Sequence, residues 1–312
     1  MMKFSITIPA YKSKYLAEAI ESCLAQTYQD FEIVIVDDNS PEDLMSIVGV
    51  YQDARIRYYR NEENCGALNV VDNWNICLSY AKGDYIICMG DDDRLLPNCL
   101  EEYAKLIEKF PELDIYHGMT EIIDENSKIS DIQEARPERE GVCSMINGRL
   151  KNRRLQFIGD WAMNRERLNQ IHGYVKMPMA WGSDDLTAYV LALNKGVANT
   201  QVPVFQYRNS SLTISNNGHF REKAKIQMNV FSEIEKMLKR NTILKDGKEE
   251  LYRLSVLKKL PELKRVSMQG YMKADMRETS LICGLFWWLQ NIHQYGFSRK
   301  EVIKAWIRSL KL

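Results

Sequence analysis

The chain has 312 residues, of which 45% are hydrophobic and 27% are charged, an ordinary globular composition with enough apolar content for a substantial core. The 42 basic residues balance the 42 acidic ones, so nothing in the composition attracts nucleic acid. Seven cysteines without a C-x-x-C pair and four isolated histidines favour buried thiols in a reducing compartment and give no zinc pattern.

The N-terminal residues give no targeting signal. Residues 4–9 alternate like a strand, and their apolar run is too short for a signal peptide. No run of about 18 apolar residues occurs, so no segment is predicted to cross a bilayer. We therefore expect a cytoplasmic protein.

Over residues 1–120, short apolar runs alternate with helical patterns. Helices are predicted around Leu16 to Leu24, from a Ser40 cap with Pro41 in the first turn, over residues 67–81, and from near Pro97. The predicted strands between them cover residues 4–9, 31–36, 56–59, 85–89 and 113–116. Repeated β-α-β units indicate an α/β fold with a mostly parallel sheet flanked by helices on both faces.

The rest of the chain is less regular up to about residue 218. Residues 122–140 are polar and predict a hairpin or a loop, residues 161–165 and 202–207 predict short strands, and residues 183–195 predict a helix. From about residue 218 the pattern is helical to the end. We expect a catalytic domain over residues 1–215, with nucleotide-sugar binding in 1–120 and acceptor binding in 121–215, and a helical C-terminal subdomain over 216–312.

Two acidic clusters come directly after predicted strands, where open α/β sheets bind ligands. Asp37 and Asp38 follow the second strand, and Asp91, Asp92 and Asp93 follow the fourth. Three adjacent carboxylates repel one another unless a cation or hydrogen-bond donors compensate them. Mg²⁺ and Mn²⁺ take oxygen ligands and bridge to phosphates, so a metal here would stabilise a diphosphate leaving group. A solvated acidic loop is the alternative interpretation.

Several motifs, in order along the chain, resemble glycosyltransferase family 2 over roughly residues 1–210. They are Ser5-Ile6-Thr7-Ile8-Pro9-Ala10-Tyr11, the stretch 25–40 that ends in Asp37-Asp38-Asn39-Ser40, Asn73-Trp74-Asn75, the stretch 81–86, and Gly90-Asp91-Asp92-Asp93-Arg94-Leu95-Leu96-Pro97. This resemblance implies the GT-A fold and an inverting transfer from a nucleotide-diphosphate sugar, with a UDP-sugar as the expected donor.

The resemblance also implies roles near the first strands. Pro9, Ala10 and Tyr11 would line the nucleotide-sugar pocket, and Asp38 would accept a hydrogen bond from the base, a uracil if the donor is a UDP-sugar.

The acidic triplet corresponds to the D-x-D motif of the family. The alignment puts Gly90 where many relatives have the first aspartate and Asp92 on the usual metal ligand. We expect Asp92 and Asp93 to bind Mn²⁺ or Mg²⁺ and Asp91 to contact the nucleotide sugar. Whether Asp91 or Asp93 assists Asp92 stays open, because Gly90 departs from the motif.

Two further residues are implied downstream. Asp185, which follows Asp184 at the start of a predicted helix, matches the general base that must deprotonate an acceptor hydroxyl; a plain helix cap is the alternative. Arg208 resembles a residue of a segment that closes over the diphosphate, a task that suits a guanidinium; a strand-end arginine in solvent is the alternative.

The last third of the chain is basic and carries aromatic residues. Basic residues outnumber acidic ones by about fifteen to seven from Arg240 to Leu312, and residues 281–289 are strongly apolar. Such helices could lie on the anionic inner face of a membrane, where lipid-linked glycan acceptors reside. An ordinary helical subdomain that packs on the catalytic core is the simpler interpretation.

The expected function is transfer of a sugar to a glycan or lipid-linked acceptor in cell-surface polysaccharide biosynthesis, without a nucleic-acid partner. A sugar nucleotidyltransferase would need a glycine-rich basic loop after the first strand, and residues 9–14 contain no glycine. A catalytically inactive nucleotide- or glycan-binding protein is the other alternative. The joint presence of Asp38, the triplet and Asp185 argues against it.

Overall fold

The computed structural model describes residues 2–151, 154–210, 218–240 and 247–310, and it forms two compact units. The first contains Met1–Ser210 with Thr242–Glu249, and the second contains Ser211–Asn241 with Glu250–Leu312. The predicted domain boundary at residue 215 lies outside the described residues, and the predicted division at residue 120 falls within a strand. None of the described helices is long and apolar enough to span a bilayer.

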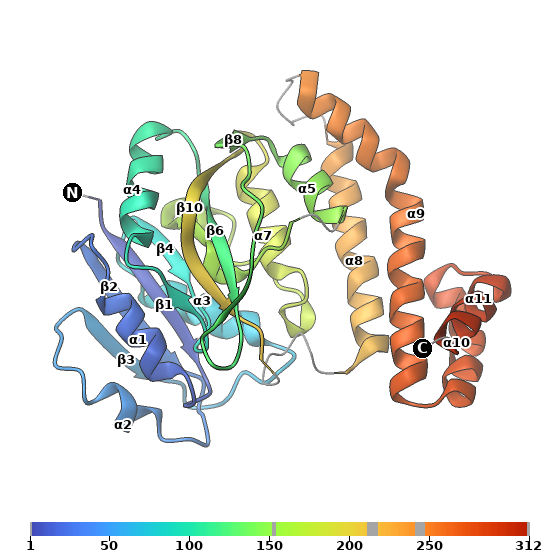
Figure 1. Cartoon of the computed structure of the whole chain (residues 1–312), viewed down its shortest axis with the longest axis horizontal. Helices are drawn as coiled ribbons and strands as arrows, with labels where there is room; N and C mark the ends of the chain where they lie inside the picture. Colours follow the sequence, from blue (N-terminus) through green and yellow to red (C-terminus); the bar gives the residue numbers. More distant parts are fainter. Residues whose placement is uncertain (1, 152–153, 211–217, 241–246, 311–312) are drawn as a thin grey trace. The chain divides into compact units, whose positions relative to one another are not determined.

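A single mixed sheet forms the centre of the first unit (Figure 1). Its strands are β1 (Phe4–Ala10), β2 (Phe31–Asp37), β3 (Ile56–Arg60), β4 (Tyr85–Cys88), β5 (Arg94–Leu95), β6 (Ile115–Ile123), β7 (Ile129–Ile132), β8 (Arg139–Glu140), β9 (Trp161–Asn164) and β10 (Val197–Arg208). The order is β3-β2-β1-β4-β9-β6-β10-β5, with β7 beside β6 and β8 beside β10.

The strand directions place several strand ends at one edge of the sheet. Strands β3, β2, β1 and β4 are parallel neighbours, and β10 is parallel to β6. Strand β9 is antiparallel to both β4 and β6, so β6 and β10 run in the same direction as β1, β2 and β4. The carboxyl ends of these five strands therefore lie at the same edge, where ligands bind in such folds.

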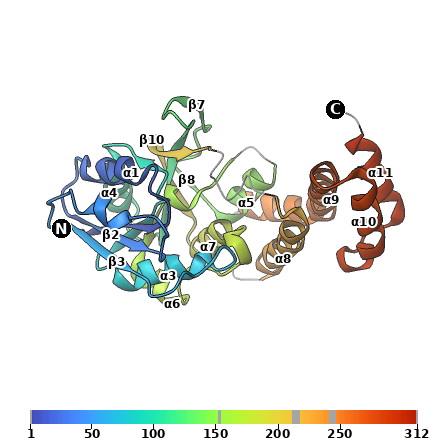
Figure 2. The ribbon, with the colours of Figure 1, turned by 90° about the horizontal axis from the view of Figure 1, so that it is seen from below.

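Helices cover both faces of the sheet, with α1 and α4 on one face and α3 and α6 on the other (Figure 2). The helices of this unit are α1 (Leu16–Leu24), α2 (Leu44–Val48), α3 (Val70–Tyr80), α4 (Cys99–Lys109), α5 (Val142–Leu150), α6 (Arg165–Gln170) and α7 (Ser183–Ala192). Successive side chains of β2 point to opposite faces of the sheet and pack against the helices on both. Ile33 and Ile35 belong to the cluster that includes residues of α1 and α4, whereas Val34 and Val36 pack against Cys77 of α3. This explains the continuous apolar runs in the sequence.

Three local predictions need correction. The Ser40 hydroxyl donates to the Tyr11 carbonyl and accepts from the Glu42 amide, so it stabilises a turn instead of capping a helix. Helix α2 begins four residues later, where Asp43 accepts from the Ser46 amide at 3.1 Å. The short helices α5 and α6 were not predicted. The strand predicted over 202–207 is the second half of the longer β10.

The second unit is helical. It contains α8 (Phe220–Lys239), nearly all of α9 (Gly247–Glu278), α10 (Leu281–Tyr295) and α11 (Arg299–Ser309). Met268, Met272 and Met276, one turn apart on α9, are fully buried and pack in one cluster with Trp288 of α10. The Trp288 indole N–H donates to the buried Asp275 carboxylate at 2.8 Å, which satisfies both polar groups inside this core.

Candidate active site

The ends of β1, β2 and β4 are joined by hydrogen bonds that involve the predicted site residues. The Asp38 amide donates to the Ala10 carbonyl at 2.9 Å, so the residue after β2 lies beside the end of β1. The amides of Tyr11 and Lys12 both donate to Oδ2 of Asp91 at 2.7 Å. The structure therefore brings Ala10, Tyr11, Asp38 and the acidic triplet together, as the parallel topology requires.

The Asp38 carboxylate is buried and held on one oxygen. Its Oδ1 accepts from the Asn61 side-chain amide at 2.8 Å and from the Cys65 backbone amide at 3.0 Å. Asn61 also donates to Asn73 of α3 at 3.1 Å, and Asn73 donates to the Val36 carbonyl. This relay fixes the orientation of Asp38. The sequence signalled Asn73 only as part of a family motif, and it gave no sign of the part played by Asn61.

Asp37 has a structural task. Its fully buried carboxylate accepts from the Ser40 amide at 2.7 Å, from the Tyr58 hydroxyl at 2.6 Å and from Arg60 at 2.6 Å. Burial, followed by the hydrogen bond to Asp37 and the Asp37 charge, raises the pKa of Tyr58 to about 12. These bonds fix the turn after β2, in which Asn39 has a φ of 51°. Asp37 thus supports the loop that presents Asp38.

Each member of the acidic triplet has a different environment. Asp91 is bound by two amides, Asp93 is buried and accepts from the Arg208 amide at 2.9 Å, and the side chain of Asp92 is partly exposed. Burial, together with the Asp92 charge, raises the pKa of Asp91 to about 6 and that of Asp93 well above its usual range. Burial also raises the pKa of Asp92. The site therefore concentrates negative charge that a cation would stabilise.

Gly90 leaves room for two of these carboxylates to converge. A Cβ atom at this position would lie 2.9 Å from Oδ2 of Asp93 and 3.0 Å from Oδ1 of Asp92. No group of three or more His, Cys, Asp or Glu side chains in the described ranges is arranged to hold a metal ion. Mg²⁺, however, is usually bound by one or two carboxylates that act together with substrate phosphates. Asp92 and Asp93 fit that pattern.

Arg208 is fully buried, so the interpretation as a solvated strand-end arginine is wrong. Its Nε donates to the Asp92 carbonyl at 2.7 Å, and its Nη2 forms an ion pair with Glu18 at 2.9 Å. Its Nη1 donates to the Asp124 carbonyl and the Ser127 hydroxyl. In this structure Arg208 anchors the acidic triplet to α1 and to the turn after β6. Contact with a diphosphate stays a prediction.

The second acidic pair lies at the start of α7. Gly182, with a φ of 81°, precedes the helix, and both Asp184 and Asp185 are in its first turn. The Nε atom of Arg149, from α5, donates to the two carboxylate oxygens of Asp185 at 3.0 and 3.2 Å. Sequence reasoning missed Arg149, because no motif surrounds it. In the part of the chain that the structure describes, Asp185 does not form a hydrogen bond with the strand-end residues.

Asp184 differs from its neighbour. Its Oδ1 accepts from the Asp185 amide at 2.8 Å. Burial, and next the charge of Asp185, raises the pKa of Asp184 to about 7, while the Arg149 guanidinium opposes this shift. Asp184 can therefore exchange a proton near neutral pH, next to the ion pair of Asp185 with Arg149.

Comparison with known proteins identifies the family of the chain. The model of a family described as glycosyl transferase family 2 matches residues 5–171, more than half of the chain. The chain belongs to glycosyl transferase family 2.

Curated relatives share the N-terminal part of this family 2 chain. An uncharacterized glycosyltransferase of Rickettsia typhi is 34% identical over 126 residues, which cover 39% of the chain and 38% of the relative. The glycosyltransferase GlyG of Streptococcus pneumoniae is 38% identical over 109 residues, which cover 34% and 35%. An uncharacterized glycosyltransferase of Methanocaldococcus jannaschii is 35% identical over 140 residues, which cover 43% and 47%. The chain thus spans less than half of the length of each of these relatives.

The fold of the family 2 chain extends to solved structures. TarS of S. aureus, residues 1–349 in complex with UDP-GlcNAc, superposes with a TM-score of 0.65 at 16% sequence identity, covering 98% of this chain and 89% of that TarS fragment. The same TarS fragment in complex with UDP gives a TM-score of 0.64. At this identity the likeness establishes the fold, a mixed α/β architecture of the GT-A type with a helical C-terminal region.

Proposed function

We propose that the chain transfers a sugar from a UDP-sugar to a hydroxyl group of a glycan or lipid-linked acceptor, with inversion of the anomeric carbon, in polysaccharide biosynthesis. The observation that carries the proposal is the convergence of Asp38 and the acidic triplet at the carboxyl edge of the parallel strands. A nucleoside diphosphate needs both a partner for its base and compensation for its phosphate charge; Asp38 would supply the first, and a cation held by the triplet would supply the second.

Asp38 supports a uracil base. The N–H donors of Asn61 and Cys65 both end on its Oδ1, and no N–H group of the described residues donates to Oδ2, which can accept a hydrogen bond from a ligand. An ionised carboxylate accepts and cannot donate, so it matches the N3–H donor of uracil and opposes the N3 acceptor of cytosine. The presence of UDP and UDP-GlcNAc in the TarS complexes supports the same donor class.

Asp92 and Asp93 would hold Mn²⁺ or Mg²⁺ between their convergent oxygens. Such an ion, when bound, neutralises the diphosphate oxygens and makes UDP a better leaving group. Asp91 is the less suitable second ligand, because two backbone amides already bind its Oδ2. We therefore assign Asp93, and not Asp91, as the second metal ligand beside Asp92.

Asp185 is the proposed general base. Its carboxylate takes the proton of the acceptor hydroxyl as that oxygen forms a bond to the anomeric carbon. The bond from this carbon to the diphosphate oxygen breaks, and its electron pair leaves with UDP. Arg149 holds the carboxylate through both oxygens, so the base keeps one orientation. Attack on the side opposite the leaving group would invert the anomeric configuration.

The test measures UDP release from a panel of UDP-sugars, with and without acceptors, in the presence of Mn²⁺ or excess chelator. Acceptor-stimulated UDP release is expected, whereas a nucleotidyltransferase would form or consume a nucleotide sugar with pyrophosphate. Calorimetry of UDP binding separates the two parts of the proposal. Equal affinity in chelator would refute the metal-bridged model, and failure of every nucleoside diphosphate to bind would refute the donor assignment.

Asp92→Ala gives the matching variant. Turnover should fall by about 10³-fold, the upper range for loss of one electrostatic stabiliser of a transition state. The melting temperature should not fall, because the substitution removes repulsion inside the triplet. Asp131→Asn, on the exposed strand β7, is the control and should keep normal turnover. An Asp92→Ala enzyme with near-normal turnover would move the metal elsewhere.

A further inference from the structure

The neutral net charge of the chain conceals two units of opposite sign. The first unit contains 24 basic and 34 acidic residues, whereas the second contains 18 basic and 8 acidic residues. A charge imbalance of this size acts over about 10 Å at ordinary salt, so the helical unit attracts anionic partners on its own account.

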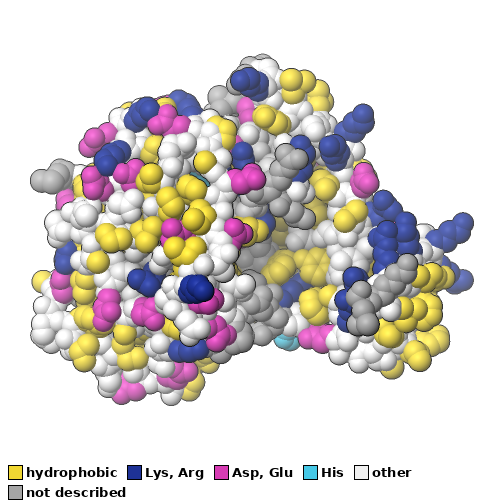
Figure 3. Space-filling view, in the orientation of Figure 1, with side chains coloured by type: hydrophobic (Ala, Val, Ile, Leu, Met, Phe, Trp, Pro, Cys, Tyr) yellow, Lys and Arg dark blue, Asp and Glu magenta, His cyan; other side chains and the backbone are white. Residues whose placement is uncertain are grey.

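One helix of this unit displays basic and aliphatic side chains side by side. On α11, residues Lys300, Ile303, Lys304, Ile307 and Arg308 follow the spacing of one helix face and are all exposed, and we call them the α11 face. Its two isoleucines are 44% and 47% exposed. In Figure 3, Lys and Arg side chains and hydrophobic side chains gather over the part of the second unit that contains α10 and α11.

The α11 face is not explained by packing or by internal ion pairs. The opposite side of the helix supplies the core, through the fully buried Val302 and Ala305. Lys300 and Lys304 form no ion pair within the described ranges of the chain. The acidic residue of α11, Glu301, binds the Ser298 amide and hydroxyl at the start of the helix. Arg308 donates to the neutral side chain of Gln269 at 2.7 Å, so within the described ranges no acidic side chain compensates the basic charges of the face.

Helix α10, which packs against α11, adds exposed apolar surface. Ile282 and Phe286, one turn apart, are 64% and 60% exposed. Large apolar side chains held in water between lysines are unfavourable for an isolated protein and favourable at a lipid–water boundary. Nucleic acid would account for the lysines but not for the aliphatic side chains.

We propose that the α11 face docks on an anionic phospholipid surface. Ile303 and Ile307 would enter the boundary between head groups and acyl chains, while Lys300 and Lys304 contact lipid phosphates. Such docking would bring the enzyme to lipid-linked acceptors, yet it does not depend on the donor chemistry proposed above.

The test is co-flotation of the full chain with vesicles of equal parts phosphatidylglycerol and phosphatidylcholine, compared with phosphatidylcholine alone. Binding is expected to the anionic vesicles, and added salt should weaken it. Lys300→Glu with Lys304→Glu should lower the partition coefficient at least about tenfold, because each basic residue contributes about a factor of five near an anionic surface. Ile303→Ser with Ile307→Ser should lower it at unchanged charge.

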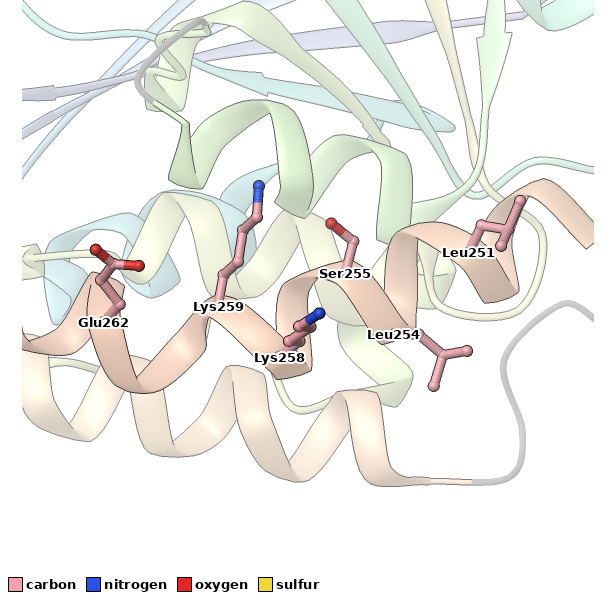
Figure 4. Close-up of a pocket in the computed structure, with 6 residues that line it drawn as sticks. All are labelled: Leu251, Leu254, Ser255, Lys258, Lys259 and Glu262. Carbon is pink, nitrogen blue, oxygen red and sulfur yellow. The ribbon is translucent and has the colours of Figure 1, made fainter.

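Helix α9 offers a matched control in the same unit. Lys258 and Lys259 are exposed and line a shallow pocket with Leu251, Leu254, Ser255 and Glu262 (Figure 4). Lys258→Glu with Lys259→Glu makes the same change of charge, and this variant should keep most of the partition coefficient for anionic vesicles. Equal losses in both charge variants would overturn the assignment to α11 in favour of bulk charge.

Two other outcomes would also overturn the proposal. One is equal binding to neutral vesicles. The other is a dimer in solution that Ile303→Ser with Ile307→Ser converts to a monomer, which would make the face a contact between copies of the chain. UDP affinity should stay unchanged in every variant, so loss of vesicle binding with intact UDP binding concerns the surface alone.

Discussion

The acidic triplet and the Asp184–Asp185 pair, both in the first unit, are compensated by different parts of the chain. The triplet receives backbone amides from Tyr11, Lys12 and Arg208, at the ends of β1 and β10. In the pair at the start of α7, Asp184 accepts from the Asp185 amide, and the only cation that contacts Asp185 in the described residues is the side chain of Arg149. Every residue except proline carries an amide, so the support of the triplet follows from the topology of the sheet. The support of the pair can be lost through a single substitution.

The sharpest test of this contrast is Arg149→Met. At pH 8 it leaves two adjacent, largely buried carboxylates without a counter-charge, and the free energy of unfolding should fall by about 3 kcal/mol. The loss should shrink towards pH 5, because Asp184 then binds a proton. Thermal unfolding at both pH values measures this. An equal loss at pH 5 and pH 8 would show that Arg149 acts through packing alone.

Asp185→Asn asks whether the pair is catalytic. The amide keeps the size of the side chain but cannot take a proton, so turnover should fall by about 10² or more while UDP affinity changes little. NMR of the product should show inversion, a β-linkage from an α-linked UDP-sugar. Near-normal turnover would pass the role to Asp184, and a retained configuration would exclude single displacement.

Lys12 permits a direct test of amide support for the triplet. Lys12→Ala keeps the N–H that binds Asp91, whereas Lys12→Pro removes it. Loss of one hydrogen bond to a charged group lowers an equilibrium constant by about tenfold or more. The proline variant should therefore bind UDP with Mn²⁺ at least about tenfold more weakly than the alanine variant. Equal affinities in calorimetry would mean that the amide is dispensable.

Asp184→Asn gives the smallest expected effect. The pKa of Asp184 is raised from 3.8 to about 7, so the native state binds a proton that the unfolded chain releases, and stability contributed by this group is lost as pH rises between those values. The asparagine variant should therefore be more stable than the native chain at pH 8, by about 1 kcal/mol or more, and show no gain at pH 4. A gain of equal size at both pH values would contradict the titration of Asp184.

The sequence predicted correctly those elements that are set by the pattern of residues next to one another in the chain. The apolar runs before Asp38 and before the triplet are strands, and parallel pairing brings their ends together. It failed for α5, where Asn147 and Gly148 are buried with their apolar neighbours and no amphipathic period appears. It also missed Arg149 and Asn61, because each reaches its aspartate through contacts between segments that are distant in the sequence or carry no motif.

The methionine row of α9 has a consequence for chemical damage. Met268, Met272 and Met276 are fully buried, so peroxide reaches their sulfur atoms only when the helical unit opens. Each sulfoxide would place a polar group in the apolar cluster that contains Trp288 and would oppose closure of the unit, so oxidation of one methionine should promote oxidation of the others. The rate at which these three thioethers oxidise, measured by mass spectrometry, would therefore report how often the helical unit opens. This readout does not require the sheet of the first unit to unfold.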